Sequence, residues 1–368
     1  MSSRRSTPDE NLSWLESLSP WPEEFGLGRM RGLLADLGDP QLAYPAIHVV
    51  GTNGKTSTTL MTAALLRAAG LRTGAYISPH VRGWAERIQV DGADAVLEAA
   101  VARVRPHAAG ATQFEVLTAA ALAEFAERRV DVAVVEAGLG GRHDATNVLA
   151  ARVVVLTNVA LEHTDVLGST REEIAAEKLA VVSPGAVVVL GEREWGDLAR
   201  EAGASRVDVV SRSNLALAVA AAEAFLEREV DPAPAEALQI PGRIERRSEQ
   251  PLEIWDGAHN LAGIGYLLAR LPTRSYTIVA SILADKRPEE MLRALTPLGD
   301  TLVATASPNP RAIPADELAR LAAPHFARVE TVPDPDEALA RARTLAGPEG
   351  AILVTGSLYL LAALSLDA

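Results

Sequence analysis

A segment of seven residues near the N-terminal end constrains the fold of this chain most strongly. The segment consists of Gly51, Thr52, Asn53, Gly54, Lys55, Thr56 and Ser57. It follows the apolar run Ala46–Val50 and precedes a stretch of helical composition. Two glycines let backbone amides close around phosphate oxygens, and the helix N-terminus adds positive charge there. The order of these parts predicts a loop that binds the phosphates of a nucleoside triphosphate. Lys55 is the candidate clamp on the phosphates, and Thr56 or Ser57 offers a hydroxyl to Mg²⁺.

Short β-branched runs alternate with longer stretches rich in alanine, leucine and charged residues. Runs that are apolar on both faces belong in a parallel sheet covered by helices. We expect such strands at Ala46–Val50, Val132–Val135, Val153–Thr157 and Ala186–Leu190. We expect helices at Gly26–Leu37, Thr58–Ala69, Thr118–Arg128, Arg171–Val182 and Leu215–Arg228. The pattern predicts a large α/β domain with a mostly parallel sheet.

The composition of the sequence changes at Asp231–Gly242, which reads DPAPAEALQIPG. Proline and alanine in this density predict the approach to an interdomain linker, with its hinge at Pro241–Gly242. A second series of strands is expected beyond it, at Leu252–Trp255, Tyr276–Ala280, Thr301–Ala304, Arg328–Val332 and Ala351–Thr355. We therefore expect an ATP-binding domain over residues 1–240 and a smaller, Rossmann-like α/β domain over residues 241–368.

Composition excludes several classes of function. The net charge of −13 argues against binding along a nucleic-acid backbone, which requires a basic surface. The chain has no cysteine, which excludes disulfides and cysteine nucleophiles and favours a reducing compartment. Met1–Glu10 is polar, and no apolar run approaches the ~20 residues that span a bilayer. We expect a cytoplasmic monomer with small-molecule substrates and no nucleic-acid or membrane partner.

The loop sequence GTNGK resembles the ATP loop of the Mur ligase superfamily, although Val49 stands where the general Walker pattern has glycine. Further segments, from about Leu27 to Tyr359, resemble motifs of the folylpolyglutamate synthase and dihydrofolate synthase family. They occur in the same order along the chain as in that family. They are Tyr76–His80, Glu86–Ile88, Phe114–Thr118, Glu136–Arg142, Asp144–Asn147, Glu162–Gly168, Glu177–Lys178, Pro241–Arg243, Asp256–Asn260, Asp285–Lys286 and Gly356–Tyr359. A Mur ligase proper carries another domain before the loop, and the fifty residues that precede Gly51 are too few for one.

The resemblance implies an enzyme that joins L-glutamate to a folate-type carboxylate. ATP would convert the carboxylate to an acyl phosphate, from which the glutamate amine displaces phosphate. Phosphoryl transfer depends on positioning and charge neutralisation, so ATP and Mg²⁺ are the expected cofactors. The acceptor is tetrahydrofolate, dihydropteroate or both.

In the first domain, Glu136 ends a buried strand, where binding Mg²⁺ would explain a carboxylate. By resemblance, Ser78 and His163 join Glu136 and Thr56 as metal ligands. The resemblance also implies that Lys178 is carbamylated, which would present a carboxylate near the metal. A solvent-facing lysine is the alternative for this position.

In the second domain, Arg243 lies at the expected hinge, and the resemblance implies that it contacts the γ-phosphate. Asp256 and His259 occupy a strand-to-helix turn and, by resemblance, bind ATP or position glutamate, with Asn260 as the helix cap. Ser357, at another strand end, is a candidate for the glutamate site.

Phe114, Asp144 and Ala145 resemble the pterin-side pocket of the family, although Phe114 suits a hydrophobic core equally well. Four positions depart from the family pattern. They are Thr56 in place of glycine, His143 in place of leucine, Glu162 in place of aspartate and Arg287 in place of aspartate. These departures keep two alternatives open. One is a related amide ligase acting on another carboxylate or amino acid, and the other is a non-catalytic ATP-binding regulator.

Overall fold

The computed structural model describes residues 8–366, which divide into two compact units. The first unit comprises the residues up to Ser78 together with Trp84–Leu238. The second comprises Pro79–Gly83 and the residues from Gln239 onward. The expected domain boundary after residue 240 lies close to the division after Leu238. The grouping of Pro79–Gly83 with the second unit was not expected from the sequence.

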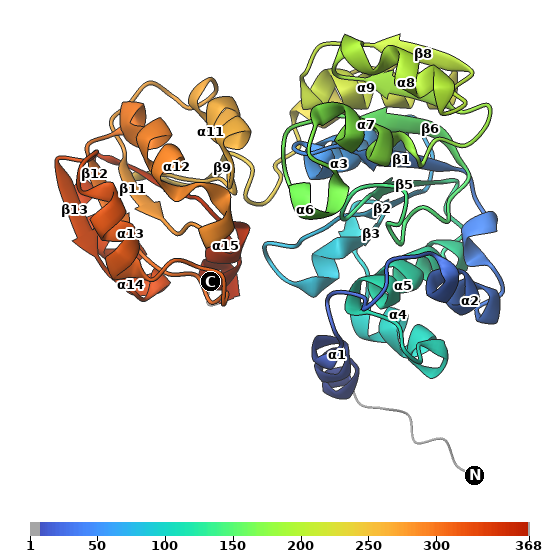
Figure 1. Cartoon of the computed structure of the whole chain (residues 1–368), viewed down its shortest axis with the longest axis horizontal. Coiled ribbons are helices and arrows are strands. Elements are labelled where there is room, and N and C mark those ends of the chain that lie inside the picture. The colour runs from blue at the N-terminus through green and yellow to red at the C-terminus, as the bar shows by residue number, and fades with distance from the viewer. Residues whose placement is uncertain (1–7, 367–368) are drawn as a thin grey trace. The chain divides into compact units, whose positions relative to one another are not determined.

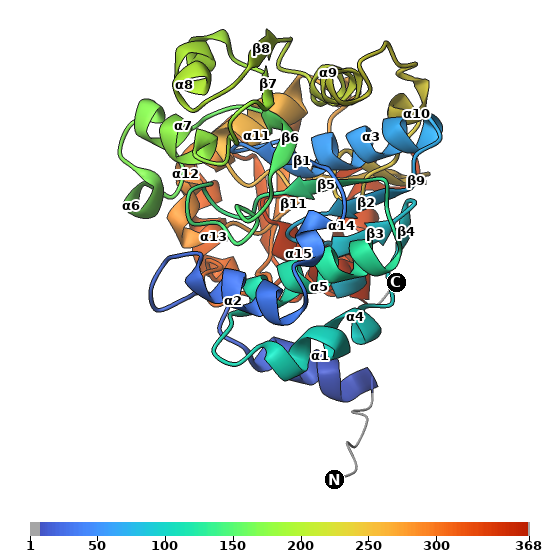
Figure 2. The same ribbon diagram turned by 90° about the vertical axis from the view of Figure 1, so that its right-hand side faces the viewer.

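The first unit is built on an eight-stranded sheet in the order β4-β3-β2-β5-β1-β6-β7-β8 (Figures 1 and 2). Its strands are β1 (Ala46–Val50), β2 (Thr73–Tyr76), β3 (Ile88–Val90), β4 (Ala93–Asp94), β5 (Val132–Glu136), β6 (Ala151–Leu156), β7 (Val187–Leu190) and β8 (Arg206–Val209). β1 runs parallel to both of its neighbours, β5 and β6, whereas β3 is antiparallel to β2 and β4. Every residue of β1 and β5 is buried, as expected for central strands covered by helices.

Helices cover the sheet of the first unit, and side chains cap the N-termini of α5, α7 and α9. They are α1 (Pro8–Ser17), α2 (Gly28–Asp36), α3 (Lys55–Ala68), α4 (Leu97–Val104), α5 (Gln113–Glu127), α6 (Thr164–Leu167), α7 (Arg171–Leu179), α8 (Gly196–Glu201), α9 (Asn214–Leu226) and α10 (Ala233–Glu236). Thr112 and Glu115 form a capping box at the start of α5, and Thr170 and Glu173 form another at α7. Figure 2 shows α3 and α9 next to each other, and residues of the two helices are in contact.

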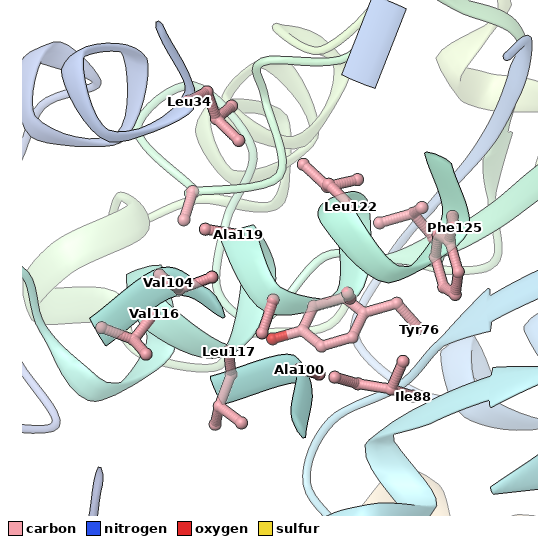
Figure 3. Close-up of a cluster of buried hydrophobic side chains, with 14 of the residues drawn as sticks. Leu34, Tyr76, Ile88, Ala100, Val104, Val116, Leu117, Ala119, Leu122 and Phe125 are labelled. Carbon is pink, nitrogen blue, oxygen red and sulfur yellow. The ribbon is translucent and has the colours of Figure 1, made fainter. Parts of the chain in front are cut away.

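A hydrophobic cluster joins α5 to the strands at the β2 side of this sheet. Tyr76 of β2, Ile88 of β3, and Leu122 and Phe125 of α5 belong to it and are fully buried (Figure 3). Removing each large apolar side chain from water contributes about 1.5–3 kcal/mol. A second cluster, centred on β6, β7 and α7, includes Val154, Leu156 and Ile174. Together these clusters hold the carboxyl ends of the central strands in fixed positions.

The second unit has a six-stranded sheet in the order β13-β12-β11-β14-β10-β9. Its strands are β9 (Glu245–Glu249), β10 (Leu252–Trp255), β11 (Thr277–Ala280), β12 (Thr301–Ala304), β13 (Arg328–Thr331) and β14 (Ala351–Thr355). Its helices are α11 (Leu261–Leu268), α12 (Pro288–Leu295), α13 (Ala315–Ala322), α14 (Pro335–Ala346) and α15 (Leu358–Leu366). Only β9 runs antiparallel to its neighbour among the described strands of this sheet.

The expected fold class, two α/β units with mostly parallel sheets, is confirmed. Every strand expected from the sequence is present, and no end differs from the expected one by more than two residues. The helix after the phosphate loop begins at Lys55 rather than Thr58, and α5 begins at Gln113 rather than Thr118 because Thr112 caps it. Within residues 8–366, no helix has the length and the apolar character that crossing a bilayer requires.

Candidate active site

The phosphate loop connects β1 to α3. Gly51 and Gly54 have positive φ angles of +145° and +83°. A side chain at Gly51 would overlap Thr157, and one at Gly54 would overlap Asn214. Glycine alone combines these backbone angles with so close an approach. The loop therefore has the tight turn at a helix N-terminus that phosphate binding requires.

Residues 157–160, which the sequence analysis did not assign to the site, support this loop through hydrogen bonds. Asn158 accepts the Asn53 N–H at 3.1 Å through Oδ1 and donates to the Asn53 carbonyl at 2.8 Å through Nδ2. Thr157 donates to the same carbonyl at 2.7 Å, and the Ala160 N–H donates to the Thr52 hydroxyl at 3.1 Å. These residues directly follow β6, so the signal available was polar residues at the carboxyl end of a buried strand.

The bracing segment is itself fixed from the next strand. Glu192, just beyond β7, accepts the Val159 N–H at 3.0 Å and the Trp195 indole N–H at 2.7 Å. Arg171 donates to the Val159 carbonyl at 3.0 Å and pairs with Glu192. The backbone N–H and carbonyl of Val159 are thus both hydrogen-bonded, which limits movement of the segment that supports the phosphate loop.

Glu136 brings together two of the other expected metal ligands. Its side chain lies at the carboxyl end of β5 and the residue is 2% exposed. The Thr56 hydroxyl donates to Oε1 at 3.1 Å, and the Ser78 backbone N–H donates to Oε2 at 3.1 Å. A carboxylate beside a hydroxyl supplies the oxygen donors that Mg²⁺ prefers, so these residues fit the expected ion.

His163 lies in the left-handed region, with φ +49°, and its Nε2 lies 3.5 Å from the Glu162 carboxylate. The part of the chain that the structure describes contains no group of three or more His, Asp or Glu side chains arranged around one point as metal ligands. Mg²⁺ commonly binds through one or two carboxylates together with substrate phosphates. A single carboxylate and nearby hydroxyls are therefore a sufficient protein contribution.

Two lysines approach the phosphate loop. The Lys55 ammonium donates to the Thr52 carbonyl at 3.2 Å. Lys178, on α7, is 4% exposed and donates to the Gly51 carbonyl at 3.0 Å. Burial, and next the charge of Lys55, lower the pKa of Lys178 to about 7. The solvent-facing alternative for Lys178 is wrong, and a substantial fraction of this amine is neutral at physiological pH.

The expected pterin-side residues converge on the loop after β5. A side chain at Gly138 would lie 2.5 Å from the Phe114 ring, so this glycine lets the ring rest against the backbone. Asp144 accepts the Leu139 N–H at 2.7 Å and the Thr146 N–H at 3.0 Å. Burial raises the pKa of Asp144, and these hydrogen bonds oppose the rise. Ala145 is buried beside it.

In the second unit, Asp256 organises the turn after β10. Its carboxylate accepts the Ile244 N–H and the Ala258 N–H, each at 2.9 Å, and burial raises its pKa. Arg243 donates to the Gly242 carbonyl at 2.9 Å. Ile244 has φ +48°, which is rare for a β-branched residue, so the hydrogen bond that its N–H donates to Asp256 fixes a strained backbone beside Arg243.

His259 and Asn260 end the same turn. His259 Nδ1 lies 2.8 Å from the Gly257 carbonyl, and the Asn260 side chain accepts the Gly263 N–H at 2.8 Å. The expectation that Asn260 caps a helix is confirmed at α11. The Gly356 N–H donates to the Ala258 carbonyl at 3.0 Å, which places the turn that carries buried Ser357 beside this one.

Comparisons with known proteins identify the family of this chain. The Mur ligase middle domain family matches residues 49–233, and the Mur ligase, glutamate ligase domain family matches residues 242–358. A dihydrofolate synthase/folylpolyglutamate synthase of Mycobacterium tuberculosis is 35% identical over 92% of this chain and 88% of that protein.

Two solved structures extend the match to three dimensions. Folylpolyglutamate synthase of Mycobacterium tuberculosis complexed with ADP superimposes with a TM-score of 0.88 and 32% identity, covering 97% of both chains. The bifunctional folylpolyglutamate synthase/dihydrofolate synthase of Yersinia pestis complexed with AMPPNP and Mn ion gives a TM-score of 0.87 and 30% identity, covering 100% of this chain and 99% of that one. This chain belongs to the Mur ligase superfamily and, within it, to the folylpolyglutamate synthase and dihydrofolate synthase family.

Proposed function

We infer that this protein is an ATP-dependent ligase that joins L-glutamate to a folate-type carboxylate. The observation that carries the inference is the braced phosphate loop beside Glu136, in a chain related over nearly its whole length to folate ligases. ATP and Mg²⁺ are its cofactors. We propose that both tetrahydrofolate and dihydropteroate serve as acceptors, as the double name of the mycobacterial relative suggests.

The first chemical step is transfer of the γ-phosphoryl group to the acceptor carboxylate. Lys55 and the loop amides bind and orient the phosphates. Glu136 and Thr56 would hold Mg²⁺, and the ion would supply positive charge to the phosphate site. Arg243 adds a guanidinium for the γ-phosphate. Ser78 and His163 remain proposed metal ligands, and Ser78 is supported by its backbone contact with Glu136.

The second step is attack of the glutamate amine on the acyl phosphate, with loss of phosphate and of one proton from the amine. We propose that Asp256, His259 and Ser357 bind ATP or position glutamate. Their support is the adjacency of the two turns that carry them, at the carboxyl ends of parallel strands.

Carbamylation of Lys178 is part of this proposal. The neutral amine attacks CO₂ and releases one proton, which converts the side chain to a carbamate with one negative charge. The lowered pKa of Lys178, about 7, supplies the neutral amine that this reaction needs. A carbamate in place of an ammonium would remove a buried cation from beside the phosphate loop.

The test is ADP release with Mg-ATP and L-glutamate, offered first with dihydropteroate and then with tetrahydrofolate. Addition of one glutamate, identified by product mass, establishes the ligase and shows which acceptor it uses. ATP binding without turnover on either acceptor would refute the folate assignment and favour another carboxylate or a regulatory role. A cytoplasmic location and a monomeric state are also proposed. Cell fractionation and light scattering test them.

A further inference from the structure

His48 is a polar residue placed where the fold calls for an apolar one. It lies in the middle of β1 and is 0% exposed. Its neighbours along the same face of the strand are Ala46 and Val50, and its partners on the adjacent strands are Val135 and Val154. All four are buried and apolar. Packing alone therefore gives no reason for an imidazole at this position.

The imidazole is the end of a short chain of hydrogen bonds. Its Nε2 lies 2.8 Å from the Thr146 hydroxyl, which donates its single proton to the Asp144 carboxylate at 2.5 Å. Because that proton is committed to Asp144, the hydroxyl accepts from His48. His48 is therefore the neutral tautomer with its proton on Nε2.

The second ring nitrogen of His48, Nδ1, lowers the stability of the folded state. Nδ1 of His48 is buried and has no hydrogen-bond partner among the described residues. An unpartnered buried acceptor destabilises the folded state, whereas an apolar side chain here would not. His48 thus lowers the stability of the fold while it fixes a polar neighbour. Residues that serve a function at the expense of stability show this combination.

We propose that His48 is a positioning residue for the folate-type acceptor, acting through Thr146 to fix the turn that carries Asp144 and Ala145. The proposal rests on the proposed function and deepens it by naming a residue that controls affinity for one substrate. Asp144 in turn holds the Leu139 N–H, and Phe114 rests against the adjacent Gly138. The chain of contacts thus runs from the central strand to the surface expected to meet the aromatic part of the acceptor.

Two pairs of variants of the full-length protein test the proposal. His48→Leu and Thr146→Val remove the hydrogen bonds, whereas His48→Gln and Thr146→Ser retain a donor and a hydroxyl. We expect both disruptive variants to raise the KM for the acceptor roughly tenfold. The KM for ATP and kcat should change less than about twofold, because the phosphate loop is untouched. The conservative variants should return the acceptor KM to within about threefold of the wild type.

The double variant His48→Leu/Thr146→Val should be no worse than either single change, since both act on one chain of contacts. An unchanged acceptor KM in both disruptive variants would overturn the proposal while the proposed function stands. Equal rises in the KM for acceptor and for ATP would also overturn it, because they indicate a general structural role. If His48→Leu does not fold, the acceptor KM of Thr146→Val alone tests the proposal, because valine has nearly the same shape as threonine. If the wild type ligates glutamate to no folate acceptor, the proposed function fails and this inference fails with it.

Discussion

Replacing His48 with glutamine should make the first unit less sensitive to acid. Burial lowers the pKa of His48 from its ordinary value of 6.5 to about 4. Between these values the unfolded chain binds a proton at this residue and the folded chain does not, so stability is lost as the pH falls below 6.5. From the two pKa values, the loss between pH 7 and pH 5 is about 2 kcal/mol. His48→Gln keeps a donor for Thr146 but cannot be protonated, and this loss should disappear.

The assay is urea unfolding of both proteins at pH 7 and at pH 5, followed by tryptophan fluorescence. Four of the five tryptophans, Trp14, Trp21, Trp84 and Trp195, lie in the first unit, so the signal reports mainly on that unit. Other titrating groups are present in both proteins, so the comparison isolates the contribution of residue 48. An equal loss of stability in wild type and variant would refute the reasoning, because it would show that His48 is free to accept a proton in the folded state.

Four further changes have expected outcomes. Lys55→Ala should reduce glutamate-dependent ADP formation by at least about a hundredfold, because it removes a cation from the phosphate site. Unchanged turnover would show that Lys55 does not clamp the phosphates. Arg243→Ala should slow acyl phosphate formation in a rapid-quench assay and leave the urea midpoint nearly unchanged; wild-type rates would place this arginine outside the site. Gly138→Ala forces a methyl group against the Phe114 ring, so the KM for the acceptor should rise more than that for ATP. With ¹³C-bicarbonate, the wild type should show a carbamate signal by NMR that Lys178→Arg lacks, and its absence from both would refute carbamylation.

Much of the fold follows from local sequence patterns. The central strands are visible because residues buried on both faces must be continuously apolar, as in Ala46–Val50 and Val132–Glu136. Thr73–Tyr76 escaped notice because it has only four residues and contains a glycine, which weakens a strand pattern. The edge strand Arg206–Val209 is half exposed and charged, so periodicity gives little signal there.

The candidate site was predictable where a residue type has an obvious chemical reason to stand at a strand end. Glu136 and the phosphate loop are of this kind. The residues that hold them were not predictable, because Asn158 reaches Asn53 across more than a hundred positions of sequence. Glu192 and His48 were missed for the same reason. Each acts through a partner that only the folded chain brings near, and neither belongs to a recognisable motif.

Because Pro79–Gly83 groups with the second unit, the backbone passes between the units after Ser78, after Gly83 and after Leu238. Val81 is buried in a cluster that also contains Trp255 and Leu361. A gene fragment that stops at Leu238 would encode Val81 without the residues that bury it, and a fragment that starts at Gln239 would lack Val81 altogether. The second half of the chain therefore completes its apolar cluster only when Val81, translated long before it, packs against it.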